Sequence, residues 1–479
     1  MDIPAPSDDS GLEKPIASPP EASKERYYAE TSATPLGVPT IGHSNGIDDE
    51  QSSLHVIIPD SGLQAWLAVI GSTAAITASY GVTNSIGTFQ SYLATHQLRD
   101  FSNRDVGWIP AVNILFTFIV GIQSGPLFDR YGPRWLLAGA SLLYVLGLTG
   151  MAFTGCGGAG DICAPGVENA RAYVILMVTW GLACGVAAAV ITTVSLAVIT
   201  HWFDARKGLA TGIAYAGSSL GGVMFPLVMR DTLSRLGWGW SVRIIMFVVL
   251  ALLLVANALI KGRTEEFRPR RTANRVKLLD LSCFTDMRFL WITIGIGMFE
   301  FVVSAVLGIL PSWAVAEGFD ETTAFAVLAV YNAGSFFGRI ISGAVSDRFG
   351  CLNTVSSVLV WSLAVIFALW LPVTRDRLPL LYIFAAVLGA STGSIMSMAA
   401  VCISQLCKPR DFGRYLGTSY SLVGLFCFLS IPICAEILEA LGPLISIILF
   451  GAFLAIALVA FVLGRWACLG YHWRWKVVV

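Results

Sequence analysis

The chain has 479 residues, of which 55% are hydrophobic and 13% are charged, whereas soluble domains average about 45–50% and about 25%. This composition excludes an ordinary soluble globular protein and indicates a protein embedded in a lipid bilayer. Lysine plus arginine and aspartate plus glutamate number 31 each, so the net charge predicts no nucleic-acid partner.

The first segment, residues 1–58, is rich in Pro, Ser, Asp and Glu and poor in large apolar residues. Such a composition cannot bury enough surface to fold alone, so we predict a disordered tail. The segment also lacks the apolar stretch of a secretory signal peptide. We therefore expect the first spanning helix to act as the insertion signal.

Apolar runs recur along the rest of the chain. A bilayer core about 30 Å thick requires about 20 helical residues per crossing, and backbone groups in lipid must find partners within the segment, which favours helices over open strands. We predict an all-α membrane protein with twelve transmembrane helices. The spans lie near 65–89, 107–127, 134–154, 172–200, 208–229, 241–261, 289–313, 322–345, 354–372, 379–403, 413–436 and 443–466.

Loop charges predict the orientation. The link after the sixth span, KGRTEEFRPRRTANRVKLLDLSCFTDMR, carries a cluster of Lys and Arg, and the positive-inside rule places it in the cytosol. An even number of spans then puts both termini there. The predicted parts are a tail at 1–58, a six-helix half at 59–261, a basic linker at 262–288, a second six-helix half at 289–466 and a short tail at 467–479.

The ten cysteines lie mostly inside apolar runs and show no metal-ligand spacing, so we expect neither a metal site nor a cofactor. Cys156 and Cys163, in the loop CGGAGDIC, are close enough to form a disulfide if that loop faces an oxidising compartment. The sequence leaves this pairing open.

A short charged pattern occurs twice, six spans apart. GPLFDRYGPRW at 125–135 and GAVSDRFG at 343–350 share the pattern G-x-x-x-D-R-[YF]-G. Internal repeats of this kind are typical of secondary transporters, so we predict two pseudo-symmetric halves. The matching residues are Gly125, Asp129, Arg130, Gly132 and Arg134 in the first copy and Gly343, Asp347, Arg348 and Gly350 in the second.

Both copies resemble the signature of the major facilitator superfamily, and the resemblance covers all twelve spans. It implies a cytoplasmic gate that latches the two halves in the outward-facing state. The glycine permits close helix approach, and the aspartate at a helix end can accept hydrogen bonds from the N-terminus of a neighbouring helix or from an arginine. The alternative is that the arginines only supply positive-inside charge.

Within that superfamily, the chain resembles the fungal branch of the monocarboxylate-porter family. The resemblance rests on PDSGLQAW at 59–66, where Ser61 departs from the family motif, on SYGVTNSIGTFQSYL at 79–93, on GWIPAVN at 107–113 and on YNAGSFFGRIISGAVSDRFG at 331–350.

Arg339 is the first candidate for substrate binding. It lies eight residues before Asp347, about 12 Å along a helix and so near mid-membrane, where an arginine costs energy unless it faces a cavity or a partner. The resemblance implies that this arginine binds a substrate carboxylate and pairs with an aspartate four residues earlier. Here that position is Ser335, so the pair is lost. The alternative is an arginine that reaches towards the cytosol.

Three further residues join Arg339 as candidates for substrate binding: Asn84, Tyr80 and Tyr215. Asn84 stands where animal monocarboxylate porters have a lysine thought to take up the proton, so its neutrality weakens a lactate-type mechanism. Glu300 also lies near mid-membrane and is the candidate for proton coupling, because a carboxyl group in a low dielectric holds its proton more readily. A purely structural hydrogen bond is an equal alternative for Glu300.

The predicted function is secondary active transport of a small organic metabolite by alternating access. An anionic cargo and proton coupling are candidates, and the sequence leaves the coupling ion open. We expect efflux of a fungal secondary metabolite across the plasma membrane. The alternatives are proton-coupled uptake of a monocarboxylate or a riboflavin-like vitamin and, more remotely, a transporter-derived nutrient sensor. No cluster of His, Cys or acidic residues at a membrane face indicates an enzyme.

Overall fold

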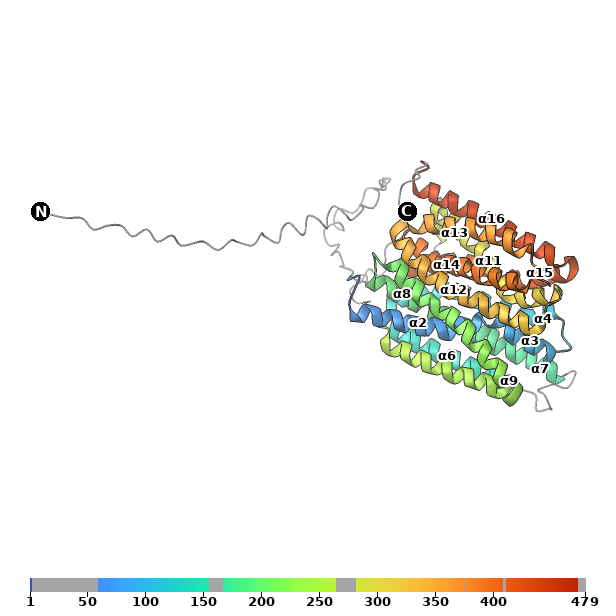
Figure 1. The fold of residues 1–479 in the computed structure, drawn as a ribbon. Coiled ribbons are helices and arrows are strands. Elements are labelled where there is room, and N and C mark those ends of the chain that lie inside the picture. Colours follow the sequence, from blue (N-terminus) through green and yellow to red (C-terminus); the bar gives the residue numbers. More distant parts are fainter. Residues whose placement is uncertain (2–58, 155–166, 264–280, 375, 408–410, 473–479) are drawn as a thin grey trace. The chain divides into compact units, whose positions relative to one another are not determined.

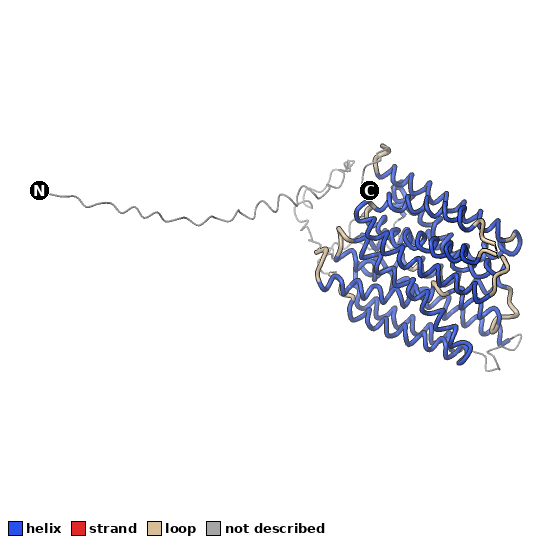
Figure 2. The backbone as a smooth tube through the Cα atoms, viewed as in Figure 1, coloured by secondary structure: helices blue, strands red, loops and turns tan. Residues whose placement is uncertain are grey.

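The computed structural model describes residues 1, 59–154, 167–263, 281–374, 376–407 and 411–472. The predicted N-terminal tail, the Cys156–Cys163 pair and most of the basic linker lie outside these residues. In the described part the chain forms helices joined by short loops and contains no strand (Figure 2).

The first half begins at the entrance to α2 and ends with the long helix α9 (Figure 1). Its elements are α2 (Leu63–Thr83), α3 (Ile86–Thr95), α4 (Asn103–Ile119), α5 (Gly121–Tyr131), α6 (Pro133–Ala152), α7 (Val167–Leu176), the π-helix η1 (Met177–Cys184), α8 (Gly185–Trp202) and α9 (Lys207–Leu259). Three predicted spans of this half are therefore built from consecutive helices: α2 with α3, α4 with α5, and α7 with η1 and α8.

Helix α9 contains two of the predicted spans. Gly237 inside it has φ 73° and ψ 179°, a conformation that glycine adopts readily and other residues rarely do. The backbone turns sharply there, so the fifth and sixth spans run as two separate helices on either side of Gly237.

The second half repeats this arrangement. Its elements are the short 3₁₀ helix η2 (Leu281–Thr285), α11 (Met287–Ala316), α12 (Glu321–Phe349), α13 (Cys351–Val365) continued by the π-helix η3 (Ile366–Trp370), α14 (Leu378–Ser404), α15 (Phe412–Leu441) and α16 (Pro443–Cys468). Each of the twelve predicted spans coincides with one of these helices, with two or three consecutive ones, or with one part of α9. Nine helical stretches of the described chain are long and apolar enough to cross a membrane.

One disulfide joins two helices of the second half. Cys351, at the start of α13, is bonded to Cys402, near the end of α14, with their Cα atoms 5.8 Å apart. The sequence did not predict this pair, because the two residues are 51 positions apart and both lie in apolar surroundings.

Two lines of close packing join the halves. The α9–α12 seam has Gly212 directly against the Arg339 carbonyl oxygen. In the α5–α15 seam, a Cβ added to Gly125 would overlap the Gly413 carbonyl group and lie 2.9 Å from its Cα. Small residues allow such backbone contact between membrane helices. Across this seam, Gly121 of α5 faces Gly417 of α15, and Gly125 faces Gly413.

Candidate functional site: a closed central cavity

The two ends of the bundle are named here after one residue each. The Asp347 end is where α5, α8, α12 and α14 finish and α9 and α15 begin. The Trp108 end is opposite, where α4 begins. Arg339 and Glu300 lie between these ends, and both are buried, with 3% and 2% of their surface exposed.

Arg339 reaches from α12 across to α9 of the other half. Its Nη1 atom donates to the Tyr215 carbonyl oxygen at 2.8 Å and to the Ser218 hydroxyl group. Its guanidinium also lies over the Tyr215 ring, 5.8 Å from the centroid. The predicted alternative of an arginine reaching towards solvent is therefore wrong, because the side chain is buried in the interface between the halves.

The remaining donors of Arg339 meet neutral partners. Nε donates to the Ser335 hydroxyl at 3.1 Å, and Nη2 lies 3.3 Å from the Met396 sulfur. Ser335, in place of the aspartate of the monocarboxylate porters, also accepts from Ser219 at 3.1 Å. No ion pair within 4.0 Å joins Arg339 to a carboxylate among the residues that the structure describes. A buried cation held only by neutral groups retains much of its attraction for an anion.

Glu300 lies on α11, close enough to Arg339 to interact with it electrostatically. Its Oε1 atom is buried and makes no hydrogen bond to a described residue. A buried carboxyl oxygen without a partner is costly. Glu300 Oε1 is thus available to a ligand, a water molecule or a proton, and the role of Glu300 in proton coupling stays a prediction.

Two small adjoining cavities lie between the halves. The first, of about 30 Å³, is lined by Glu300, Asn84 and the apolar residues Ile114 and Ile431 among others. The second, of about 20 Å³, is lined by residues that include Tyr215, Tyr420 and Thr192. The residues that line both are Tyr80, Thr117 and Phe118.

These cavities are too small for an organic cargo, since pockets for drug-sized ligands measure about 300–1,000 Å³. They hold at most a few water molecules. At the Trp108 end, Trp108 of α4 packs against Phe428 of α15 with ring centroids 5.2 Å apart. At the Asp347 end, α12 is bonded to the start of α9. The structure is therefore a compact state with both ends closed.

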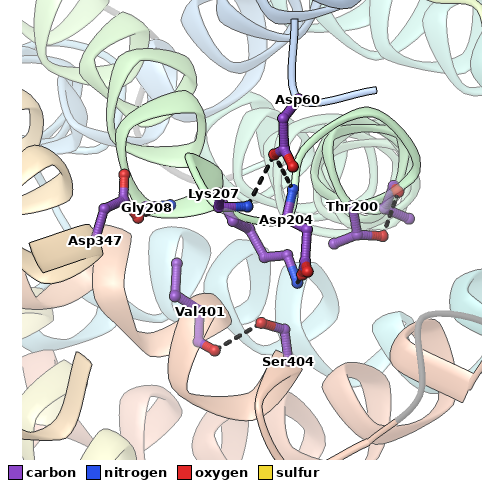
Figure 3. A network of polar contacts seen from close by, with 10 residues as sticks. Asp60, Thr200, Asp204, Lys207, Gly208, Asp347, Val401 and Ser404 are labelled. Carbon is purple, nitrogen blue, oxygen red and sulfur yellow. Dashed lines mark hydrogen bonds and ion pairs between the residues drawn. The ribbon is translucent and has the colours of Figure 1, made fainter. Parts of the chain in front are cut away.

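The aspartate of the second motif copy joins the halves at the Asp347 end. Asp347 Oδ1 accepts from the Gly208 N–H at 2.8 Å and Oδ2 accepts from the Leu209 N–H at 2.9 Å. Figure 3 shows Asp347 beside the first turn of α9. The first N–H groups of a helix have no partner within the helix and carry partial positive charge, so a carboxylate stabilises them. The predicted capping of a neighbouring helix N-terminus is present for this copy.

The first motif copy is described only in part. Gly125 makes the close approach to Gly413, and Gly132, with φ 77°, ends α5. The Arg130 guanidinium lies over the Tyr131 ring, 5.2 Å from its centroid. The side chain of Asp129 lies outside the described part of the chain, so its predicted role stays a prediction.

The structure brings the predicted cavity residues together, although in different roles. Tyr80 and Tyr215 pack edge to face, with centroids 6.3 Å apart, and Tyr80 lines both cavities. Asn84 lines the first cavity, and its Nδ2 donates to the Ser218 carbonyl oxygen at 3.1 Å. Asn84 therefore ties α2 to the same segment of α9 that holds Arg339.

Several cavity residues were not among the predicted site residues. Phe118 stacks on Tyr420 across the two halves, with ring centroids 5.4 Å apart. Met396 contacts both Arg339 and the first cavity. Apolar and aromatic residues occur throughout every span, so no sequence signal separates those that face the cavity from those that face lipid.

The comparisons agree with this architecture. The sequence profile of the Major Facilitator Superfamily matches residues 65–417. An MFS-type transporter of Penicillium oxalicum is 31% identical over 80% of this chain and 86% of its own length. The aspyridones efflux protein of Emericella nidulans is 28% identical over 82% of this chain and 76% of its own.

Two further proteins are similar over most of the chain. The riboflavin transporter of Saccharomyces cerevisiae is 28% identical over 89% of this chain and 83% of its own length. The crystal structure of a human organic anion transporter superposes with a TM-score of 0.66 over 84% of this chain and all of that one, at 13% identity, and so supports the fold. With its two similar halves, central buried charges and matching profile, the chain belongs to the major facilitator superfamily and is a multi-pass membrane protein.

Proposed function

We propose that this transporter exports a small anionic organic metabolite by alternating access, with Arg339 as the residue that binds the anion. The observation that carries this proposal is the buried position of Arg339 between the halves, where its charge meets only hydroxyl, carbonyl and thioether groups. A bound carboxylate or enolate would supply the missing counter-charge and could form two parallel hydrogen bonds to the guanidinium.

The direction of transport is inferred from relatives. The aspyridones efflux protein, which is named for export, is similar over 82% of this chain. The loss of the aspartate at Ser335 and of the lysine at Asn84 removes two charges that a proton-coupled monocarboxylate importer is expected to use. Efflux is therefore favoured over uptake.

Protons are the proposed coupling ion, and Glu300 is the proposed carrier. Its carboxyl group is buried in the first cavity and has one oxygen without a partner. In this scheme, ionised Glu300 competes with the anion for Arg339, so the anion leaves together with a proton, and export requires an outward anion gradient that exceeds the inward proton gradient. Proton binding and anion binding are then coupled through the electrostatic interaction between these two buried groups.

We place the Asp347 end in the cytosol and the protein in the plasma membrane. The basic residues Arg130, Arg134, Arg206, Lys207 and Arg348 lie at this end, as the positive-inside rule requires of a cytosolic face. Closing the Asp347 end while opening the Trp108 end gives the outward-facing state, and the reverse gives the inward-facing state. The structure lies between the two.

The test is a comparison of metabolites in cells and medium between a strain that lacks the gene and one that carries it. Export predicts at least one compound that accumulates in the deleted strain and falls in its medium. Reintroducing the natural chain should reverse both changes, while Arg339→Ala, present in the membrane at equal amount, should not. A metabolite profile identical in the two strains would remove the efflux proposal.

Uptake of a riboflavin-like vitamin is the second candidate, because the yeast riboflavin transporter matches 89% of this chain. The same strains distinguish it. If the protein imports the vitamin, cells that lack the gene contain less of it and leave more of it in the medium. This is the opposite of the pattern that export predicts.

A further inference from the structure

A second carboxylate holds the turn that leads into α9. Asp60, just before α2, accepts through Oδ1 from the backbone N–H of Asp204 at 2.6 Å and of Ala205 at 2.8 Å. Figure 3 shows Asp60 approaching this turn from one side and Asp347 lying against Gly208 on the other. Two aspartates from distant parts of the sequence thus bind four N–H groups within six residues of chain.

The turn lacks a cap of its own. Helix α8 ends at Trp202, Phe203 is extended, and α9 begins after Arg206, which makes no side-chain capping bond. Helix starts are usually held by a Ser, Thr, Asp or Asn at this position. Here the local sequence supplies none, so the direction of the first turn of α9 depends on carboxylates from elsewhere.

Asp60 is itself held firmly against the end of α8. Its N–H donates to the Trp202 carbonyl oxygen at 3.1 Å, and Trp66, one helical turn into α2, packs against Phe203 with centroids 5.3 Å apart. Asp60 also has φ 50°, which is uncommon for a residue other than glycine. Such a conformation persists only where the surroundings fix it, and it is often found at functional positions.

The two aspartates differ in which half they belong to. Asp60 and residues 204–205 are both in the first half, so their bonds persist when the halves separate. Asp347 belongs to the second half, so its bonds to Gly208 and Leu209 must break when the Asp347 end opens. Asp60 therefore holds the conformation of the turn while Asp347 is not bound to it. The turn is then preorganised, and Asp347 binds it again with less loss of conformational entropy.

We propose that Asp60 is a positioning residue of the gate: it fixes the turn before α9 so that the Gly208 and Leu209 N–H groups are aimed at Asp347 when the halves close. This inference rests on the proposed alternating-access function. It assigns to the segment before α2 a part in setting the balance between the closed and open Asp347 end.

The experiment measures how often that end opens. Ser346 is 5% exposed and lies directly against Gly208, so a cysteine at 346 can react with a maleimide only after α9 and α12 separate. Trypsin cleaves after Arg339 and Arg348, so the labelled cysteine is read by mass spectrometry on peptide 340–348, apart from the native cysteines. The full chain is used, in lipid nanodiscs.

Asp60→Ala is expected to raise the labelling rate at 346 about tenfold, and Asp60→Asn about threefold, since a neutral acceptor forms weaker hydrogen bonds than a carboxylate. The matched control is Asp204→Asn, which removes the same charge from the same turn. The Asp204 side chain is 66% exposed, and its carboxylate bonds to Lys207 at 3.2 Å. It should leave the rate within twofold of the natural chain.

A second reporter separates positioning from loss of fold. Gly107→Cys sits at the Trp108 end, where its Cβ would meet Gln90 and Ile431 at 3.6 and 3.9 Å. Gate positioning predicts slower labelling there as labelling at 346 rises, whereas loosening of the whole bundle predicts faster labelling at both reporters and would overturn the proposal.

Asp347→Asn separates this inference from the function on which it rests. If it speeds labelling at 346 while Asp60→Ala and Asp60→Asn leave the rate within twofold of the natural chain, the role of Asp60 is refuted and the gate stands. If none of the three changes the rate, the gate itself is refuted.

Discussion

The glycine at position 125 offers the sharpest test of the closed Asp347 end. Gly125 of α5 and Gly413 of α15 belong to different halves, and a Cβ on Gly125 would overlap the Gly413 carbonyl group and lie 2.9 Å from its Cα. Non-bonded carbon atoms prefer about 3.5–4.0 Å. In Gly125→Ala the two helices must therefore move apart by about 1 Å.

The cost of this movement falls on the closed state alone. Overpacking a tight contact costs about 1–3 kcal/mol, which corresponds to a loss of about 5- to 150-fold in the ratio of closed to open Asp347 end. Alanine also favours a helix by about 0.5–1 kcal/mol over glycine, so the fold is not expected to suffer. Separating the halves removes the overlap, so the substitution does not raise the free energy of the open state.

The assay is maleimide labelling of Ser346→Cys in Gly125→Ala, with Gly139→Ala as the matched control. Gly139 is in α6, where an added Cβ meets nothing within 4 Å. Both changes add one methyl group to a helix, but only the first adds it at the α5–α15 seam. Equal labelling rates in the two variants would refute the idea that this contact closes the gate.

Other predictions concern the buried charges and one capped helix. Arg339→Lys keeps the charge but loses the bonds to Ser335 and Tyr215 and the planar fork that binds carboxylates, so cargo export measured in proteoliposomes should fall at least tenfold; export at the natural rate would show that Arg339 does not bind the anion. Glu300→Gln keeps the shape and removes the titrating group, so export should stop responding to an imposed pH gradient while anion exchange persists, and a preserved response would transfer the coupling role to another group. At the start of α11, burial raises the pKa of Asp286, but hydrogen bonds from Arg288 outweigh burial and hold that pKa below its usual value. Because the folded-state pKa is the lower one, the stability that Asp286 supplies is present above its unfolded pKa of about 4 and is lost as the pH falls through the folded value. The melting temperatures of the natural chain and of Asp286→Asn should therefore differ at pH 7 and converge as the pH falls below the folded pKa of Asp286, and a difference that stays constant throughout this acid titration would contradict this assignment.

The sequence by itself determined the spans, the repeat and the position of the buried charges. In lipid, backbone N–H and C=O groups must find hydrogen-bond partners within the segment, so long apolar runs predict helices. All twelve runs coincide with helical segments. The spacing from Arg339 to Asp347 placed Arg339 well inside the bundle because a helix rises by a constant amount per residue, and Arg339 is buried there. The motif predicted that its aspartate could accept hydrogen bonds from the N-terminus of a neighbouring helix or from an arginine, and Asp347 accepts from the first N–H groups of α9.

Only the tertiary structure decided which partners those residues meet. Arg339 bonds to Tyr215 and Ser218, more than 120 residues away, and Asp60 holds a turn that lies 144 residues further on. Cys351 and Cys402 pair for the same reason. Such contacts depend on how helices rotate and pack against one another, and in a membrane the apolar surface that faces lipid resembles the surface that faces a cavity, so hydrophobic periodicity does not record the difference.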